Sequence, residues 1–392
     1  MKRYLQVFSG GFPNREVKYE DLKNKLEKIL NVIKIDGLII GWYDDENFYS
    51  ILKKFLEAHK VKLYFWWPIF SELSYFKNFS EVIDYKGNEI EKFSFQEGEN
   101  FEFYCPNDLE NMKNIKEIFD NRISKYDVDG IFLDKIRYPA FSNGKDSVFS
   151  CFCENCIEKM KEYGIDTEEL KKYISKSFEK KDSNPLEIEE YKNFKYKFKN
   201  KNLDNYFKFK NEVIYHRVKE ITDYIKQKGW EVGFDIYAPN ISYLFGQDIN
   251  KLSETADFIK PMYYRKTFAP AGIPFELQNY ETLYGLEAKK YLLQLIGEEK
   301  LEDNISKEQM LKELKDISDR YKNIYIGIDF NKKDNIALSN SLYIEEVMDT
   351  LHEADSEGIV LSWDYMSIPE EHIKVFLEKE REDVNEWIHI RM

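Results

Sequence analysis

The sequence DGIFLDKIRYP, residues 129–139, contains a short apolar run that ends in an acidic residue, Asp134. Seven other short runs of apolar, β-branched or aromatic residues also end in polar residues, and the segments that follow have helical spacing and abundant Lys and Glu. This alternation predicts parallel strands joined by crossover helices. The eight predicted strands are Arg3–Phe8, Gly37–Trp42, Lys62–Trp67, Gly130–Asp134, Glu231–Tyr237, Phe258–Tyr263, Ile324–Asp329 and Ile359–Trp363.

Eight such units are the number that closes a parallel barrel, so we expect a single (β/α)8 TIM barrel of the α/β class over residues 1–392. The helical spacing is clearest at Tyr19–Ile33, Asn47–His59 and Ser306–Tyr321. A doubly wound open sheet would give the same alternation, but no Gly-x-Gly-x-x-Gly motif follows any of the strands. The closed barrel is therefore the prediction.

Two of the connections between strands are much longer than the others. They are Pro68–Tyr126 after the third strand and an insertion at residues 139–229 after the fourth. Within the second insertion we expect helices at Thr167–Lys181 and Glu187–Lys228. Because loops at the C-terminal ends of the strands build the active sites of barrels, we expect both insertions to border the functional face.

The composition limits the partners of the protein. The chain is 43% hydrophobic and 16% aromatic, which supplies a large core, and its formal net charge is −14. That charge repels nucleic-acid phosphates, and the lysines of Lys192–Lys210 have the spacing of a solvated helix face. The N-terminus lacks the pattern of a signal peptide, and no apolar run approaches the roughly 18 residues of a membrane span. We therefore expect a cytoplasmic protein with reduced thiols that binds neither nucleic acid nor membrane, and the sequence leaves a homo-oligomer open.

The sequence has four cysteines, and three of them lie close together as Cys151-x-Cys153-x-x-Cys156. The fourth, Cys105, lies in the other long insertion. Four thiolates suit a tetrahedral Zn²⁺ ion and leave no open position for water, so the predicted zinc is structural. Disulfides are disfavoured in the cytoplasm, whereas an iron–sulfur cluster would use the same four ligands and stays open as an alternative.

The cysteine segments carry a family resemblance. Residues 104–107 (YCPN) and 151–156 (CFCENC), with a strand between them, resemble the zinc cluster of glycoside hydrolase family 42 β-galactosidases. The resemblance covers only the loops after strands three and four and implies a metal-binding role for the four cysteines. The Asn-Glu acid/base pair of that family is absent from the fourth strand here, so β-galactosidase activity is not implied.

Acidic residues recur where predicted strands end, at Asp134, Asp235, Asp329 and Asp364. Hydrolysis of a glycosidic bond uses one carboxylic acid to protonate the leaving oxygen and a second carboxylate, or the substrate, to stabilise the oxocarbenium-like centre. Since adjacent strands lie about 4.8 Å apart, Asp134 and Asp235 are the predicted catalytic pair, with the acid and the nucleophile unassigned. All five histidines lie in predicted helices or the tail, which argues against a histidine metal site or a Ser-His-Asp triad.

Residues 129–139 resemble the fourth-strand motif of glycoside hydrolase-like barrels related to the family 18 chitinase and family 13 amylase clans. Similar motifs occur at residues 233–239 (GFDIYAP), 246–248 (GQD) and 257–264 (DFIKPMYY), the last resembling the Met-x-Tyr strand of family 18. The resemblance implies a TIM barrel that acts on carbohydrate. The Glu of chitinases would fall at Ile136 and the Asp after Met-x-Tyr at Arg265, so chitinase chemistry is not implied.

Further residues at the strand ends are predicted to bind the substrate. Aromatic rings stack on the C–H faces of sugars, and charged groups bond to sugar hydroxyls. Arg137 is expected to keep Asp134 ionised, with a structural ion pair at the rim as the alternative. For Lys260 the alternative is a buried ion pair with Asp235. The predicted substrate-binding residues are Trp66, Arg137, Tyr237, Lys260, Tyr263, Glu276, Asp329, Trp363 and Asp364.

These features together predict a glycoside hydrolase that acts on an oligosaccharide or glycoside. Because neither the chitinase Glu nor the family 42 Asn-Glu pair is present, a catalytically inactive carbohydrate-binding barrel is the alternative. A third hypothesis is a metal-dependent hydrolase whose ion is held by the strand-end carboxylates instead of the thiolates.

Overall fold

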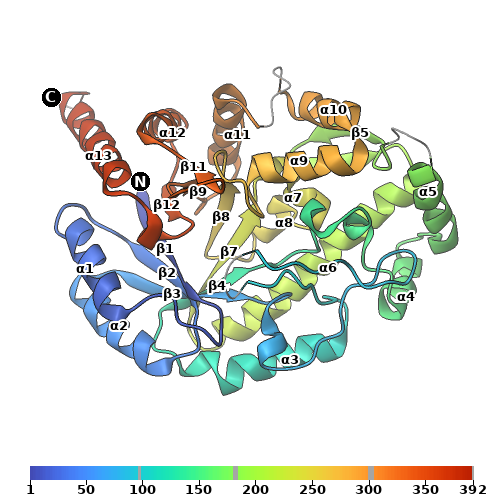
Figure 1. Cartoon of the computed structure of the whole chain (residues 1–392), viewed down its shortest axis with the longest axis horizontal. Helices are drawn as coiled ribbons and strands as arrows, with labels where there is room; N and C mark the ends of the chain where they lie inside the picture. The colour runs from blue at the N-terminus through green and yellow to red at the C-terminus, as the bar shows by residue number, and fades with distance from the viewer. Residues whose placement is uncertain (96–98, 180–183, 299–303, 391–392) are drawn as a thin grey trace.

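In the computed structural model, eight parallel strands form a closed barrel in the order β1-β12-β9-β8-β7-β4-β3-β2 (Figure 1). The structure describes residues 1–95, 99–179, 184–298 and 304–390, with the side chains of 382–390 not described. The predicted TIM barrel is confirmed, and each observed strand overlaps its prediction. The barrel strands are β1 Lys2–Gly10, β2 Gly37–Trp42, β3 Lys62–Pro68, β4 Gly130–Asp134, β7 Glu231–Tyr237, β8 Phe258–Tyr263, β9 Tyr325–Asp329 and β12 Gly358–Ser362.

The helices surround the barrel, and several begin where a polar side chain caps the first turn (Figure 1). The Asp45 carboxylate accepts from the Phe48 amide at the start of α2, and Asn200 caps α6 in the same way. The helices are α1 Tyr19–Leu30, α2 Glu46–Ala58, α3 Leu109–Asn121, α4 Glu154–Glu162, α5 Thr167–Glu179, α6 Lys201–Lys226, α7 Pro239–Ser242, α8 Ile249–Leu252, α9 Ile273–Tyr284, α10 Leu286–Ile296, α11 Lys307–Arg320, α12 Ser341–Glu353 and α13 Glu370–Ile390.

Aromatic rings fill the N-terminal end of the barrel. Tyr4, Tyr64, Phe258 and Tyr325 come from the first residues of four strands, and their contacting ring centroids lie 5.0–5.9 Å apart. Two residues further along β8 the side chain of Lys260 crosses the interior beside Gly327, where a Cβ atom would overlap it. The barrel therefore has an aromatic floor, a polar layer above it, and an opening at the C-terminal ends of the strands.

The second insertion differs from the prediction in one element. The helix predicted over Glu187–Lys228 begins only at Lys201, and the segment before it forms a hairpin of β5 Ile188–Lys192 and β6 Lys195–Phe198. The two residues between the strands, Asn193 and Phe194, have φ angles of 54° and 60°. Positive φ at both central residues is the backbone of a type I′ turn, which matches the twist of a hairpin. The helix prediction for this part was wrong.

Candidate active site

A pocket lies among the C-terminal ends of β1, β3, β4, β7 and β8 and the loops that follow them. It brings together six residues that the sequence analysis selected, namely Trp66, Asp134, Arg137, Asp235, Tyr237 and Trp363. Its other lining residues are Gln6, Phe95, Glu99, Phe101, Lys135, Met262, Tyr264, Thr267, Ala269, Pro270 and Ala271. The pocket thus combines carboxylates with aromatic rings.

Asp134 ends β4, and both of its carboxylate oxygens accept hydrogen bonds from N–H groups. Trp66 Nε1 donates to Oδ2 at 2.9 Å, and the Lys135 amide donates to Oδ1 at 2.5 Å. The φ angle of Lys135 is 50°, a left-handed conformation that is uncommon for lysine and often found at functional sites. These two donors fix the orientation of the carboxyl group toward the pocket.

Asp235 lies deeper than Asp134, on the neighbouring strand β7, and its side chain is 2% exposed. Its Oδ2 accepts from Lys260 Nζ at 3.0 Å, while its Oδ1 has no partner among the described residues. Burial raises the pKa of Asp235 to about 7, the Lys260 ammonium opposes this shift, and the Asp134 carboxylate adds to it. The two carboxyl groups are therefore close enough for the charge of one to affect the other.

Lys260 is fully buried and does not line the pocket. Besides Asp235, its Nζ donates to Gln6 Oε1 at 2.7 Å and to the Tyr264 hydroxyl at 2.6 Å. Burial lowers the pKa of Lys260, and the Asp235 carboxylate opposes that effect. Of the two alternatives for Lys260, the structure contains the buried ion pair with Asp235.

Arg137 is buried but does not pair with Asp134 as expected. Its guanidinium lies between the rings of Phe103 and Tyr237, 4.6 Å from each centroid, and its Nη1 donates to the carbonyl of Tyr138 at 2.9 Å. Within the described residues no carboxylate lies at ion-pair distance from it. Stacking between two rings holds Arg137 in the pocket wall, and the Asp134 carboxylate is contacted instead by the two N–H donors described above.

Besides Lys260, four predicted residues lie outside the pocket lining. Asp329 accepts from the Lys266 amide, the Thr267 hydroxyl and the Tyr343 hydroxyl, and so holds the loop that lines one wall. Glu276 does not line the pocket but contacts a residue that does, because its Oε1 accepts a hydrogen bond from the hydroxyl of Tyr237 at 3.2 Å. Asp364 caps a short 3-10 turn by accepting from the Met366 amide, and Tyr263 points outward from the barrel.

The outward position of Tyr263 follows from strand geometry. Successive side chains of a strand point to opposite faces, so Lys260 and Tyr263, three residues apart, cannot both face the interior. The Tyr263 hydroxyl instead donates at 2.9 Å to Glu313 of α11, which also accepts from Gln309 and Asn240. Burial raises the pKa of Glu313 to about 7.

Glu313 should therefore make the stability of the protein depend on pH. Its pKa is raised in the folded state, so the folded state binds more protons between about pH 4.5 and 7, and the free energy of unfolding should fall as pH rises through that window. In Glu313→Gln this fall should be smaller by about 3 kcal/mol. Chemical denaturation across this pH range measures it, with the exposed Glu308→Gln on the same helix as control. Identical pH profiles for Glu313→Gln and Glu308→Gln would contradict the assignment.

The sequence analysis missed several pocket residues, and only some of them left a signal. Gln6 is a polar residue inside an apolar strand, and Lys135 directly follows Asp134. Both could have been found from the strand pattern. Glu99 lies in the loop between β3 and α3, where no periodic pattern indicates which side chain turns inward.

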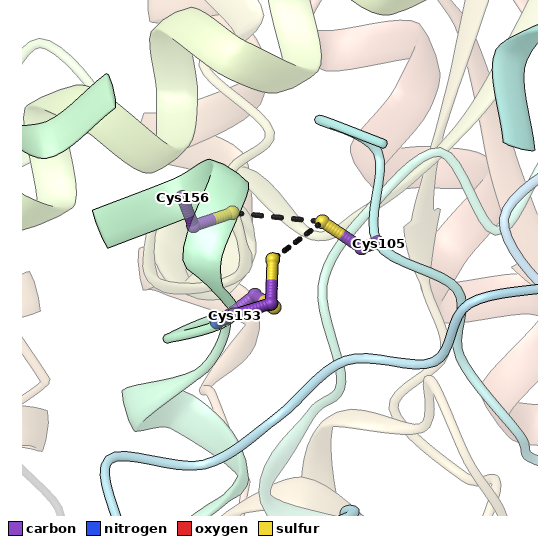
Figure 2. Close-up of side chains that lie close together, drawn as sticks. Cys105, Cys153 and Cys156 are labelled. Carbon is purple, nitrogen blue, oxygen red and sulfur yellow. Dashed lines mark hydrogen bonds between the residues drawn. The ribbon is translucent and has the colours of Figure 1, made fainter. Parts of the chain in front are cut away.

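The four cysteines come together although they belong to two insertions. All four Sγ atoms lie within 4.8 Å of one another, and Cys105 Sγ is 3.6 Å from Cys153 Sγ and 3.5 Å from Cys156 Sγ (Figure 2). Four sulfurs around one zinc ion at 2.3 Å would be about 3.8 Å apart. The Ile83 and Cys153 amides donate to Cys151 Sγ at 3.3 and 3.4 Å, as amides do around bound thiolates. The cluster therefore fits a single tetrahedral ion.

A buried lysine lies close to the cluster. Lys210 of α6 is fully buried, burial lowers its pKa to about 7, and the charge of Cys151 opposes that shift. Within the described parts of the chain, the cysteines form the one group of three or more His, Cys, Asp or Glu side chains with the spacing of metal ligands. The cluster joins the loop before α3 to the start of α4, so a bound ion would tie together two insertions that border the pocket.

The comparisons with known proteins bear on the fold. No protein-family model matches the chain, and no curated protein matches its sequence. The glycoside hydrolase domain of PgaB (BpsB) from Bordetella bronchiseptica is similar over 97% of both chains, with a TM-score of 0.57 and 11% identity. The two share a barrel fold. The predicted resemblance to glycoside hydrolase barrels is thereby confirmed at the level of the fold.

A second similar structure is α-L-fucosidase isoenzyme 2 from Paenibacillus thiaminolyticus. The match has a TM-score of 0.52 and 11% identity, and it covers 98% of this chain. It covers 49% of the fucosidase, so this chain spans about half the length of that protein.

No helix in the described residues is both long enough and apolar enough to cross a membrane.

Proposed function

We propose that the protein is a glycoside hydrolase that uses Asp134 and Asp235 at the pocket. The observation that carries this proposal is the pair of carboxyl groups on adjacent strands β4 and β7, facing one pocket that also contains Trp66 and Trp363. Two carboxyl groups and an aromatic wall are the elements that glycosidic hydrolysis needs. The glycoside hydrolase domain of PgaB and the α-L-fucosidase share this fold, which supports the proposed chemistry by analogy.

The environments of the two carboxyl groups suit different tasks. Asp134, held by two N–H donors and nearer to solvent, would face the anomeric carbon as a carboxylate and either attack it or activate a water. Asp235, with its pKa of about 7, would carry a proton below neutral pH and bond to the substrate or to Asp134 from the pocket floor. Neither position identifies the group that protonates the departing oxygen.

A catalytically inactive carbohydrate-binding barrel is the second candidate. Two observations favour it. One carboxylate oxygen of Asp235 already accepts a hydrogen bond from Lys260, and the pocket volume is only about 80 Å³. Small-molecule sites more often enclose roughly 300–1,000 Å³.

A screen of aryl glycosides and oligosaccharides separates these candidates. The purified chain is incubated with phenyl and methylumbelliferyl glycosides of common sugars and with oligosaccharide mixtures, and new reducing ends are measured. We expect turnover of at least one sugar class after exhaustive chelation, because the carboxyl groups need no metal for this chemistry. Binding without any turnover would favour the second candidate, and turnover that chelation abolishes in folded protein would favour a metal-dependent hydrolase.

We further propose that the four cysteines bind one structural Zn²⁺ ion in a cytoplasmic, reducing environment. The sulfur spacing supports a single ion in preference to the several metal atoms of an iron–sulfur cluster. With all four ligands supplied by thiolates, the ion would stabilise the two insertions and take no part in hydrolysis.

Replacing Cys156 by Ser should remove the metal and lower the free energy of unfolding by several kcal/mol, because metal binding to a folded site adds directly to stability. Elemental analysis of the wild-type protein should give one zinc per chain, and the variant close to none. Glu154→Gln, an exposed neighbour on the same helix, is the control. A wild-type protein that contains iron, or a variant that keeps its zinc and its stability, would contradict the proposal.

A further inference from the structure

Glu99 is a pocket carboxylate that neither the sequence motifs nor the proposed pair includes. It belongs to the long loop between β3 and α3 and lines the pocket together with Asp134 and Lys135. Its side chain is 18% exposed, against 2% for that of Asp235. Glu99 therefore lies nearer the mouth of the pocket, while Asp235 lies at the floor.

The Glu99 carboxylate is available to a ligand. Its single ion contact is with Lys135 Nζ, at 4.0 Å, and none of the described residues donates a hydrogen bond to it. Lys135 is committed elsewhere, because its ammonium is bonded to Glu72 and lies 4.0 Å from the ring centroid of Phe101. Asp134 differs, since both of its oxygens already have donors.

The pKa of Glu99 is shifted upward from that of an ordinary surface acid. Burial raises the pKa of Glu99, the Lys135 ammonium lowers it, and the Asp134 carboxylate raises it again. Lys333, from the hairpin of β10 Lys332–Lys333 and β11 Ala337–Leu338, also lowers it, with a weaker effect. A raised pKa is the direction of shift that a general acid needs.

We propose that Glu99 is a third catalytic carboxyl group and protonates the glycosidic oxygen of the leaving group. This inference rests on the proposed glycoside hydrolase function. When a sugar occupies the pocket floor, the rest of the substrate leaves toward the mouth, where Glu99 lies. The long insertion after β3 would then supply the acid, and strands β4 and β7 the groups on the sugar side.

The proposed step conserves atoms and charge. The proton of the Glu99 carboxylic acid passes to the glycosidic oxygen, the bond from the anomeric carbon to that oxygen breaks, and its electron pair stays on the oxygen. The Asp134 carboxylate either bonds to the anomeric carbon or takes a proton from the water that does so. Glu99 is left as a carboxylate and regains a proton from the water that completes hydrolysis, or from solvent.

The test compares leaving groups. For the sugar that the wild-type protein hydrolyses, kcat/KM is measured on a phenyl glycoside, whose leaving oxygen needs a proton, and on a dinitrophenyl glycoside, whose leaving oxygen does not. Glu99→Gln should lose roughly 10²–10⁴-fold on the phenyl glycoside and less than about tenfold on the dinitrophenyl glycoside. The high-pH limb of the kcat/KM profile should also disappear. Glu89→Gln, exposed in the same insertion, should behave as wild type on both.

The outcomes separate this inference from the function on which it rests. If the wild-type protein hydrolyses no glycoside, the proposed function fails. If it does, and Glu99→Gln loses equal activity on both leaving groups or none on either, Glu99 is not the acid. Thermal unfolding of the variant, expected to match the wild type because Glu99 forms one weak ion contact, excludes a folding defect as the cause.

Discussion

Replacing Asp134 by Asn should lower kcat by about 10³-fold or more and leave substrate binding nearly unchanged. The amide keeps the shape of the carboxylate but cannot attack the anomeric carbon or accept a proton from water. It also places an NH2 group against one of two donors, Trp66 Nε1 or the Lys135 amide. We therefore expect an additional loss of about 1–2 kcal/mol in the free energy of unfolding. Steady-state kinetics and calorimetric binding on the same sugar measure both effects.

The matched control is Asp127→Asn, an exposed aspartate just before the same strand, which should keep full activity. A loss of kcat with a parallel loss of binding would indicate that Asp134 only holds the pocket together. Unchanged kcat in Asp134→Asn would remove Asp134 from the mechanism.

Replacing Lys260 by Met should destabilise the protein by about 3–5 kcal/mol at pH 8, because it leaves the Asp235 carboxylate buried without its cation. The loss of the ammonium raises the pKa of Asp235 beyond its present value of about 7. A carboxyl group with a raised folded-state pKa loses stability as pH rises, so the destabilisation should be larger at pH 8 than at pH 5. Chemical denaturation at the two pH values measures the difference.

The double variant Lys260→Met with Asp235→Asn tests the pairing itself. Removing both charges should recover part of the lost stability, since a neutral pair in the interior avoids the cost of an unpaired charge. If the two single effects simply add, or if Lys260→Met is equally destabilising at both pH values, the ion pair does not contribute as described.

The barrel could be predicted because each strand pairs a recognisable apolar run with a following helix, and the parallel arrangement then brings the strand ends together. Asp134 and Asp235 both point inward, and the position of each at a strand end is visible in the sequence. The wrong prediction that Tyr263 faces the pocket was avoidable. Tyr263 lies an odd number of residues after the inward-facing Lys260, so its side chain must face outward. The hairpin at Ile188–Phe198 was missed because its apolar residues also fit a helical spacing, while the Asn193 turn was overlooked.

The insertions set the limit of what the sequence could predict. The Cys151-x-Cys153-x-x-Cys156 spacing indicated a metal site because its chemistry is local, and Cys105 could be added because no other cysteine exists. Glu99 has no such pattern. Its approach to Asp134 depends on how the loop after β3 packs over the barrel, and the orientation of Arg137 depends on two rings, Phe103 and Tyr237, that come from distant parts of the chain.

The most direct test of the account is a crystal structure of the Asp134→Asn variant with the sugar that the wild-type protein hydrolyses. The account predicts a sugar ring stacked against Trp66 or Trp363, with its anomeric carbon facing residue 134 and the glycosidic oxygen toward Glu99. A sugar bound elsewhere on the protein, or one whose anomeric carbon points away from both Asp134 and Asp235, would contradict it.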